Sequence, residues 1–499
     1  MNEQFTEIFS RIEELLRYNS TAPLIFNSGL FLFLFVAFLS LYILLRRTTT
    51  LRILYVVAFS LFFYYKSSGI YFLLLVFAAV SDYLIAHSIA RTQDERMKRR
   101  WVAASVVINL GMLGYFKYTN FFVEIANSIV GAGFLDFQNI FLPVGISFFV
   151  FQSMSYTIDV YRGAIKPLDR WIDYIFYLSF FPQLVAGPIV RAKDFIPQIR
   201  KPVEVTQRMF GMAIGLIIIG LIKKAIISDY ISLNFVDRIF DEPGLYSGFE
   251  CLMGIYGYAL QIYCDFSGYS DMAIGIALLL GFRFPKNFDA PYKSATITEF
   301  WRRWHISLSS WLRDYLYISL GGNRKGKLRT YLNLLLTMVL GGLWHGAAIR
   351  FVLWGALHGV ALAVHKMWMA IIPWAKAKGE DMNPVVRIFG WVITFNVVCL
   401  GWLLFRAEDM QTVQLMLHQI AYNFNPAIIP QVVEGYKAVM ALIVLGYVMH
   451  FIPRRIDEDM MSRVGSAGFW WQVALLAVTA WCVMQVKSSD IQPFIYFQF

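Results

Sequence analysis

Residues 331–346 read YLNLLLTMVLGGLWHG, an apolar run that contains no Asp, Glu, Lys or Arg and ends in an ionisable histidine, His345. A basic turn at residues 324–329 precedes the run. If the run is a membrane helix that starts at this turn, His345 lies about 16 residues and roughly 24 Å along it, inside the hydrocarbon layer. Ionisable groups are costly there, so His345 is either a functional residue or a histidine that packs helices together by bonding a backbone carbonyl.

Similar apolar runs occur along the whole chain. Hydrophobic residues make up 58% of the 499 residues and charged residues only 15%. Runs at residues 24–45, 70–90, 209–227, 252–282 and 470–486 approach or exceed the roughly 20 residues that a spanning helix needs. We therefore predict an all-α polytopic membrane protein with about 11 spans.

The basic residues stand between these apolar runs. The net charge is +11, and the clusters fall at residues 46–47, 91–100, 162–170, 191–201, 324–329 and 454–455. By the positive-inside rule the clusters lie on the cytoplasmic side, which places both termini outside. Both termini outside requires an even number of spans, so the parity of the predicted count of about 11 stays open. Nucleic acid would require these charges on one continuous face, so we expect membrane lipids but no nucleic acid among the partners.

The segment before the first apolar run has its own pattern. Residues 1–21 contain four glutamates and lack the basic start of a secretory signal. The apolar side chains recur at helical spacing, at Phe5, Ile8, Phe9, Ile12 and Leu16. We predict an amphipathic segment that lies on the membrane surface and stays in the mature chain.

Prolines and glycines interrupt some of the apolar runs. They fall at residues 142–145, 181–188 and 281–285. Irregular backbone at membrane depth is tolerated only where protein or a water-filled cavity covers it, so the chain must fold around something internal. The four cysteines and seven histidines lack metal-ligand spacing, and no phosphate-binding glycine loop is present. We therefore predict no metal site and no bound cofactor.

Residues 300–317 read FWRRWHISLSSWLRDYLY and combine aromatic and basic side chains. The spacing of three and four residues predicts one helix with an apolar face made by Trp301, Trp304, Leu308 and Trp311. The polar side chains fall largely on the opposite face, at Arg302, Arg303, His305 and Ser309. Such a helix either lies at the membrane interface or turns its polar face toward an internal cavity.

Taken together, residues 181–191, 263–273, 284–292, 300–323 and 341–346 resemble the membrane-bound O-acyltransferase family (MBOAT), in its bacterial branch of alginate O-acetylation and teichoic-acid D-alanylation proteins. The resemblance runs from about residue 137 to residue 405, and residues 492–497 are similar to the branch's ending. It implies a ring of transmembrane helices around a thinned centre, with a funnel or tunnel open to both sides. The implied division is an amphipathic segment (1–21), N-terminal membrane helices (22–135), a catalytic core (136–405) and C-terminal helices (406–499).

The resemblance also implies the site residues. His345 matches the family's catalytic histidine, and His305 matches the second histidine near the tunnel. A neutral imidazole can accept a hydroxyl proton, so we expect His345 to act as a general base, with a covalent acyl-histidine as the less favoured route. His305 would orient a substrate or polarise the thioester carbonyl. Substrate contacts are expected at Trp304, Asn287 and Trp344, and Arg302 and Arg303 either bind a donor phosphate or pantetheine arm or anchor the chain.

The implied function is transfer of a short acyl group, with acetyl expected first, across the bacterial cytoplasmic membrane. The donor would be a cytoplasmic thioester, acetyl-coenzyme A or an acyl-carrier protein. The acceptor would be a polysaccharide hydroxyl outside, reached directly or through an exported SGNH-hydrolase-like partner protein. Two alternatives stay open: a transporter or channel for an acylated or anionic solute, and a scaffold without chemistry. A transporter predicts an internal repeat, and we see none between the two halves.

Overall fold

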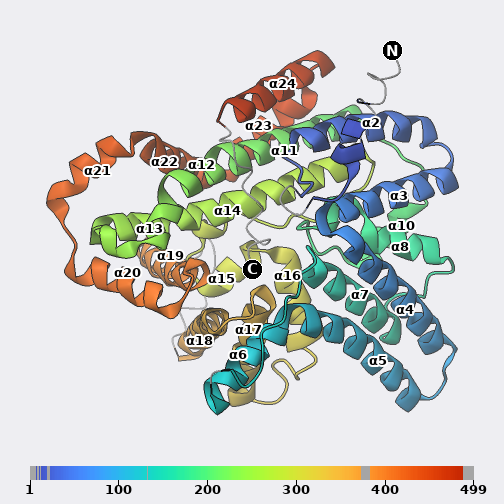
Figure 1. Cartoon of the computed structure of the whole chain (residues 1–499), viewed down its shortest axis with the longest axis horizontal. Coiled ribbons are helices and arrows are strands. Elements are labelled where there is room, and N and C mark those ends of the chain that lie inside the picture. The colour runs from blue at the N-terminus through green and yellow to red at the C-terminus, as the bar shows by residue number, and fades with distance from the viewer. Residues whose placement is uncertain are drawn as a thin grey trace. The chain divides into compact units, whose positions relative to one another are not determined.

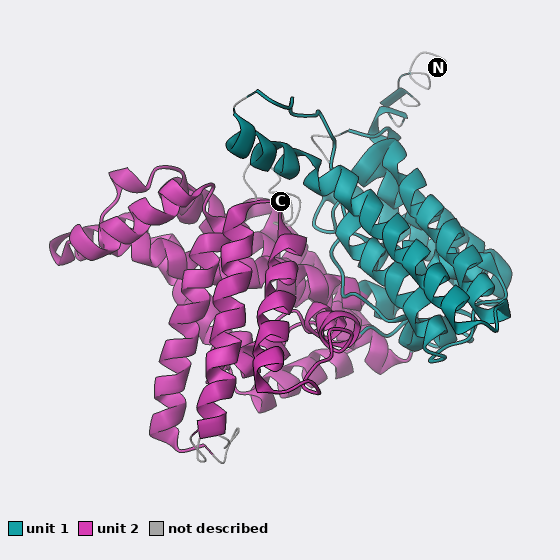
Figure 2. Ribbon diagram, turned by 90° about the horizontal axis from the view of Figure 1, so that it is seen from below, with its two compact units in different colours: residues 1–205, 276–284 teal, residues 206–275, 285–499 magenta. Residues whose placement is uncertain are grey.

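The computed structural model describes residues 7, 10, 11, 13–19, 23–131, 133–371 and 382–486. These residues form helices and connecting segments, with no β-strand among them, which confirms the predicted all-α class (Figure 1). The chain divides into two compact units, residues 1–205 with 276–284, and residues 206–275 with 285–499 (Figure 2). The predicted amphipathic segment lies mostly outside the described residues, and the predicted ending at 492–497 lies wholly outside them. The predicted domain boundaries stay a prediction.

Unit 1 is a bundle of helices in which α4, α5 and α7 pack on one another and α8 contacts both α3 and α4. Its elements are α2 (Gly29–Leu45), α3 (Thr49–Ser68), η1 (Gly69–Tyr71), α4 (Phe72–Arg91), α5 (Glu95–Leu113), η2 (Gly114–Tyr118), α6 (Thr119–Val130), α7 (Ile146–Tyr161), α8 (Trp171–Ser179), α9 (Phe181–Leu184) and α10 (Ala192–Ile199). The apolar runs predicted at residues 24–45 and 70–90 correspond to α2 and α4.

The interrupted run at residues 181–188 is covered by protein within unit 1. It forms the short helix α9 and a turn, and Phe181, Leu184 and Ala186 are all at most 1% exposed. A Cβ on Gly187 would lie 2.4 Å from the Cα of Gln183, so the turn closes only with glycine there. The expectation that irregular backbone would be covered is confirmed for this segment.

Unit 2 contains the remaining helices and every predicted site residue. Its elements are α11 (Gln207–Leu221), η3 (Ile222–Ser228), α12 (Asp229–Ile231), η4 (Ser232–Val236), α13 (Asp237–Asp241), η5 (Pro243–Leu245), α14 (Gly248–Leu279, of which 276–279 belong to unit 1), η6 (Pro291–Lys293), α15 (Ile297–Arg303), α16 (Ile306–Trp311), η7 (Leu312–Tyr317), α17 (Lys327–His345), α18 (Ile349–Ile371), α19 (Pro384–Arg406), α20 (Met410–Tyr422), η10 (Pro426–Ile428), α21 (Ile429–Gly435), α22 (Lys437–Phe451), α23 (Arg454–Ser466) and α24 (Phe469–Val486).

Helices α17 and α18 form an antiparallel hairpin whose backbones approach closely (Figure 1). A Cβ on Gly342 would lie 2.1 Å from the carbonyl oxygen of Phe351, and a Cβ on Gly355 would lie 2.3 Å from that of Met338. Membrane helices associate without a hydrophobic driving force, and small residues at their contacts let the two backbones approach closely enough to pack well. The glycines therefore hold the end of α17, and His345 with it, against α18.

A buried lysine links η3 to α14. The Lys224 ammonium pairs with Asp229 at 2.8 Å and also with Asp265, and the side chains of Lys224 and Asp265 are each 3% exposed. The neighbouring Lys223 pairs with Asp271 at 2.7 Å. Charges buried in this way must be paired, so the two aspartates of the 263–273 motif serve to neutralise the lysines of the adjacent helix.

Among the described residues, three stretches are long and apolar enough to cross a membrane: Thr49–Arg91, Gln207–Asp241 and Pro384–Arg406. Two sharply bent pairs raise the count to five if each pair is one span, namely Pro426–Gly435 with Lys437–Phe451 and Arg454–Ser466 with Phe469–Gln485. The predicted total of about 11 spans stays a prediction.

Candidate active site

His345 is the last residue of α17, at the point where the hairpin turns toward α18. The residue is 3% exposed. Its ring makes T-shaped contacts with Trp344, Trp354 and Phe405, at centroid distances of 4.9, 5.0 and 5.2 Å. The position predicted from the sequence, at the end of an apolar helix, is confirmed. The neighbours contributed by α18 and α19 give the histidine aromatic walls.

The segment around His305 differs from its prediction. One continuous helix was expected for residues 300–317, but α15 ends at Arg303, α16 begins at Ile306, and the following turn is π-helical. His305 stands at the break with φ 41° and ψ 56°, in the left-handed region. Side chains rarely adopt this conformation unless their surroundings hold it. The prediction of a single helix with His305 on its polar face was wrong, because His305 is fully buried beside Trp304.

Asn287 holds the backbone break at His305. Its side-chain Oδ1 accepts hydrogen bonds from Nδ1 of His305 at 3.2 Å, from the backbone N–H of Ser307 at 3.2 Å and from the Ser307 hydroxyl at 2.9 Å. Its backbone carbonyl accepts from the N–H of Ile306 at 2.9 Å, and its Nδ2 donates to the Ser270 hydroxyl at 3.2 Å. Asn287, at 1% exposure, thus positions His305 within the site.

These hydrogen bonds assign the tautomer of His305. The backbone N–H of Ser307 can only donate, so the atom it meets on Asn287 is the amide oxygen. That oxygen can accept from His305 only if Nδ1 of the ring carries a proton. The neutral ring then has its acceptor lone pair on Nε2.

Trp344 connects the two histidines. Its ring centroid lies 4.9 Å from that of His345 and 6.3 Å from that of His305. Trp304 belongs to the wall of the same site, with Trp402 at 4.7 Å. Four of the predicted residues, His345, His305, Trp344 and Trp304, therefore belong to one aromatic cluster, joined by Asn287 through its bond to His305.

The two predicted arginines occupy different environments because successive residues on a helix point in different directions. Arg303 is bonded to other residues of the chain: it forms an ion pair with Glu299 at 2.8 Å and donates a hydrogen bond to the backbone carbonyl of Asp289 at 3.2 Å. Arg302 is exposed and forms no ion pair with any residue that the structure describes. Of the two, Arg302 is the side chain available to an anionic substrate.

The sequence did not point to Trp354, His358 and Phe405, which complete the cluster from α18 and α19. His358 and His365 are two of the seven histidines that lack metal-ligand spacing in the sequence. In the described part of the chain, no group of three or more His, Cys, Asp or Glu side chains is placed to hold a metal ion. The spacing of seven residues between the two histidines was the available signal, since it places them on one face of α18.

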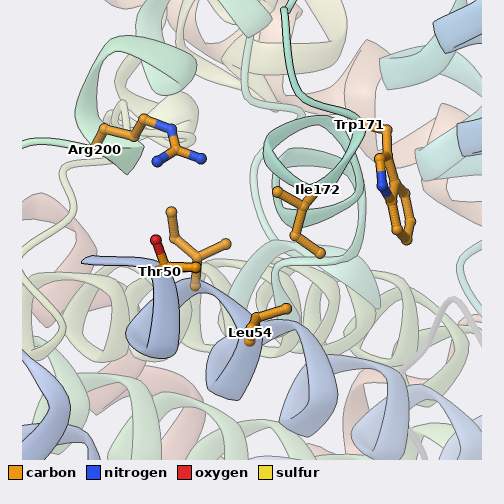
Figure 3. Close-up of a pocket in the computed structure, with 6 residues that line it drawn as sticks. Thr50, Leu54, Trp171, Ile172 and Arg200 are labelled. Carbon is orange, nitrogen blue, oxygen red and sulfur yellow. The ribbon is translucent and has the colours of Figure 1, made fainter. Parts of the chain in front are cut away.

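A cavity in unit 1 involves none of the predicted site residues. It measures about 170 Å³ and is lined by Thr50, Ile53, Leu54, Trp171, Ile172 and Arg200 (Figure 3). The Arg200 guanidinium at its edge is bound by both oxygens of Asp173, at 2.6 and 2.8 Å. The tunnel expected at His345 stays a prediction.

Comparison with known proteins places this site in a family context. A family model described as MBOAT, the membrane-bound O-acyltransferase family, matches residues 139–404, just over half of the chain, and this range contains every predicted site residue. A probable alginate O-acetylase of Pseudomonas putida is 37% identical over 95% of this chain and all of its own length. A peptidoglycan O-acetyltransferase of Helicobacter pylori is 38% identical over 78% of each chain. A teichoic acid D-alanyltransferase of Bacillus subtilis is 29% identical over 54% of this chain and 70% of its own.

Proposed function

Because this chain belongs to the membrane-bound O-acyltransferase family, and is therefore a multi-pass membrane O-acyltransferase, we propose that it moves an acetyl group from a thioester to a polysaccharide hydroxyl. The named relatives act on alginate and peptidoglycan, so the acceptor is a cell-envelope or exported polysaccharide. The donor is acetyl-coenzyme A or an acylated carrier protein on the cytoplasmic side of the bacterial inner membrane. Acetyl reaches the polymer directly or through an exported SGNH-hydrolase-like partner.

The proposed architecture lets donor and acceptor meet inside the membrane. About 11 helices form a ring around a thinned centre with a funnel or tunnel. Support comes from the cluster of histidines and tryptophans in unit 2, because polar groups are placed at such depth where they face a cavity or one another. Irregular buried backbone, as at residues 181–188, is the second supporting feature.

The proposed chemistry assigns His345 the role of general base. Its ring accepts the proton of the acceptor hydroxyl while the oxygen attacks the thioester carbonyl. The carbon–sulfur bond then breaks, the acetyl ester forms, and the thiolate takes the proton from the imidazolium to leave as a thiol. General-base catalysis contributes about 10²–10⁴-fold. His305 orients the acceptor hydroxyl rather than polarising the carbonyl, because its acceptor nitrogen is Nε2 while Nδ1–H is committed to Asn287.

One observation carries the proposal: the only histidine in the run at 331–346, which has no Asp, Glu, Lys or Arg, stands at the end of α17, inside aromatic walls and one tryptophan away from a second histidine. The test uses protein purified into lipid nanodiscs, acetyl-labelled acetyl-coenzyme A and oligosaccharide acceptors. His345→Ala should lower thioester consumption by about 10²-fold or more. His418→Ala is the matched control, because His418 is exposed on α20 and should retain full activity.

The same assay separates the other functional classes. A transporter or a scaffold leaves the thioester intact whichever variant is used. Full activity of well-folded His345→Ala protein would remove His345 from the chemistry while leaving the family assignment in place. Trapping of labelled acetyl on the wild-type protein, absent in His345→Ala, would favour the covalent route over the general-base route.

A further inference from the structure

The cavity of unit 1 has walls that are largely apolar, and four of its six lining residues are exposed at the surface (Figure 3). Ile53 is 1% exposed, whereas Leu54 and Trp171 are 47% and 54% exposed, so the cavity runs from the surface inward to Ile53. Its volume of about 170 Å³ is close to that of an engineered apolar cavity of about 150 Å³ that stays dry and binds benzene. A hydrocarbon group is therefore the kind of ligand that these walls fit.

The cavity lies where a candidate membrane span begins. The span Thr49–Arg91 starts one residue before Thr50, and α8 starts at Trp171, so the first turns of two helices supply part of the lining. An exposed tryptophan is typical of the level of the lipid headgroups. The positive-inside rule assigns this end of α3, which follows the basic residues 46–47, to the cytoplasmic side. The cavity thus lies at the depth where the headgroups of the cytoplasmic leaflet meet their acyl chains.

A buried arginine joins the basic segments around the cavity. Arg52 is 1% exposed and donates hydrogen bonds to the backbone carbonyls of Arg46 at 3.3 Å, Ile199 at 2.7 Å and Lys201 at 3.2 Å. The residue that follows it, Ile53, lines the cavity. The ends of α2 and α10 are therefore held beside the start of α3. The exposed cationic residues on these segments and at the start of α8 are Arg46, Arg47, Arg170, Arg200 and Lys201.

Positive charge exceeds negative charge at this end of unit 1. Residues 46–52, 169–173 and 199–201 contain six arginines and lysines but only two carboxylates, Asp169 and Asp173, and Asp173 is already bound to Arg200. The start of α3 adds to the positive potential, because its N-cap residue Thr48 makes no side-chain hydrogen bond and its first turn has no acidic residue. An apolar cavity beside such a rim matches an amphiphile with a negatively charged head.

We propose that this cavity holds an acyl chain of an anionic phospholipid from the cytoplasmic leaflet. The lipid phosphate lies at the start of α3 among the exposed arginines, and the first part of the chain lies against Ile53 and Leu54. Each Lys or Arg near a membrane surface raises the affinity for anionic lipid about fivefold. Lipid that merely surrounds an apolar helix face has no such headgroup preference. The site is separate from the chemistry at His345 and stands whether or not the proposed function is correct.

The test uses the full chain, freed of lipid in detergent, and phosphatidylglycerol that carries a photoreactive diazirine in its acyl chain. Labelled residues are mapped by mass spectrometry. We expect saturable labelling within residues 50–54 and 171–172, and labelling at least fivefold weaker with phosphatidylcholine of the same chains. Inorganic phosphate at millimolar concentration should not displace phosphatidylglycerol, because it lacks the chain that fills the cavity. Equal labelling by both lipids would show ordinary surrounding lipid, and displacement by phosphate would show a free-anion site; either result overturns the lipid site.

Leu54→Trp tests the cavity, because the larger side chain fills its entrance from an exposed position that folding tolerates. It should lower labelling of residues 171–172 about tenfold for either lipid. Leu51→Trp is the matched control, since Leu51 is 51% exposed on the same helix and does not line the cavity. Undiminished labelling in folded Leu54→Trp protein would show that the chain does not enter the cavity, and the proposal fails.

The double variant Arg46→Gln and Arg170→Gln tests the basic rim without changing the cavity walls or the Arg200–Asp173 pair. It should weaken the binding of phosphatidylglycerol about 30-fold, at about fivefold for each arginine, and leave phosphatidylcholine unchanged. Arg387→Gln, an exposed arginine of unit 2, is the charge control. If the double variant keeps the wild-type preference for phosphatidylglycerol, the rim does not select the headgroup and the proposal is wrong.

Discussion

Asn287→Ala should destabilise the protein and impair catalysis together. The substitution removes the acceptor of three hydrogen bonds at the left-handed turn, two from Ser307 and one from Nδ1 of His305. The Ser307 hydroxyl lies 3.4 Å from Nδ1 of His305 and can replace one of these bonds by rotating. The backbone N–H of Ser307 has no such substitute for the lost acceptor.

The size of the effect follows from this count. One buried backbone donor deprived of its acceptor costs about 1–3 kcal/mol, and the weakened bond to His305 adds about 1 kcal/mol. We expect a loss of about 2–4 kcal/mol in unfolding free energy. Because His305 stands at φ 41° only while its neighbours hold it, activity should fall beyond what the loss of folded protein explains.

The assay measures the thermal midpoint and thioester consumption in the same nanodisc preparation, with activity normalised to folded protein. Asn287→Asp keeps an oxygen that accepts these bonds, but it loses the donation to Ser270 and buries a carboxyl group at a position that is 1% exposed. We therefore expect its activity to lie above that of Asn287→Ala while its thermal midpoint also falls. Asn396→Ala is the matched control, because Asn396 is exposed on α19 and accepts one bond from the Tyr256 hydroxyl. Wild-type midpoint and activity in Asn287→Ala would refute the reasoning that this side chain holds the turn.

Further substitutions test other parts of unit 2 and one helix of unit 1. Gly342→Ala should separate α17 from α18 and lower both stability and activity, because its Cβ would lie 2.1 Å from a backbone carbonyl oxygen. Gly111→Ala is the control, because a Cβ at this position would have no atom within 4 Å. It should be neutral or stabilising by up to about 1 kcal/mol in the same thermal assay. Lys224→Met leaves Asp265 buried without its lysine and should cost about 3–5 kcal/mol, measured by denaturant titration; an unchanged midpoint would show that Asp265 is neutral. Arg302→Ala should raise KM for acetyl-coenzyme A without shifting the thermal midpoint, whereas Arg303→Ala should shift the midpoint, and the reverse pattern would contradict the division of roles.

Local sequence properties determined the class of this protein and the position of its central histidine. The length and composition of the apolar runs predicted helices that the structure contains, and the ordered motifs predicted the family that the comparisons show. His345 was located because a histidine at the end of an apolar run without Asp, Glu, Lys or Arg is informative by itself. These properties depend on neighbours along the chain, which is why sequence suffices for them.

The tertiary structure decided the surroundings of that histidine. The break at His305 exists because Asn287, from the preceding loop, supplies hydrogen bonds that a regular helix would not need. His358 is buried because α15, α18 and α19 bring together Trp301, His358 and the Gly401 backbone. Helical spacing shows which side chains share one face of a helix. Which element covers that face depends on packing between segments far apart in the chain. This packing must let the backbones approach closely and must also provide partners for the buried hydrogen-bonding groups.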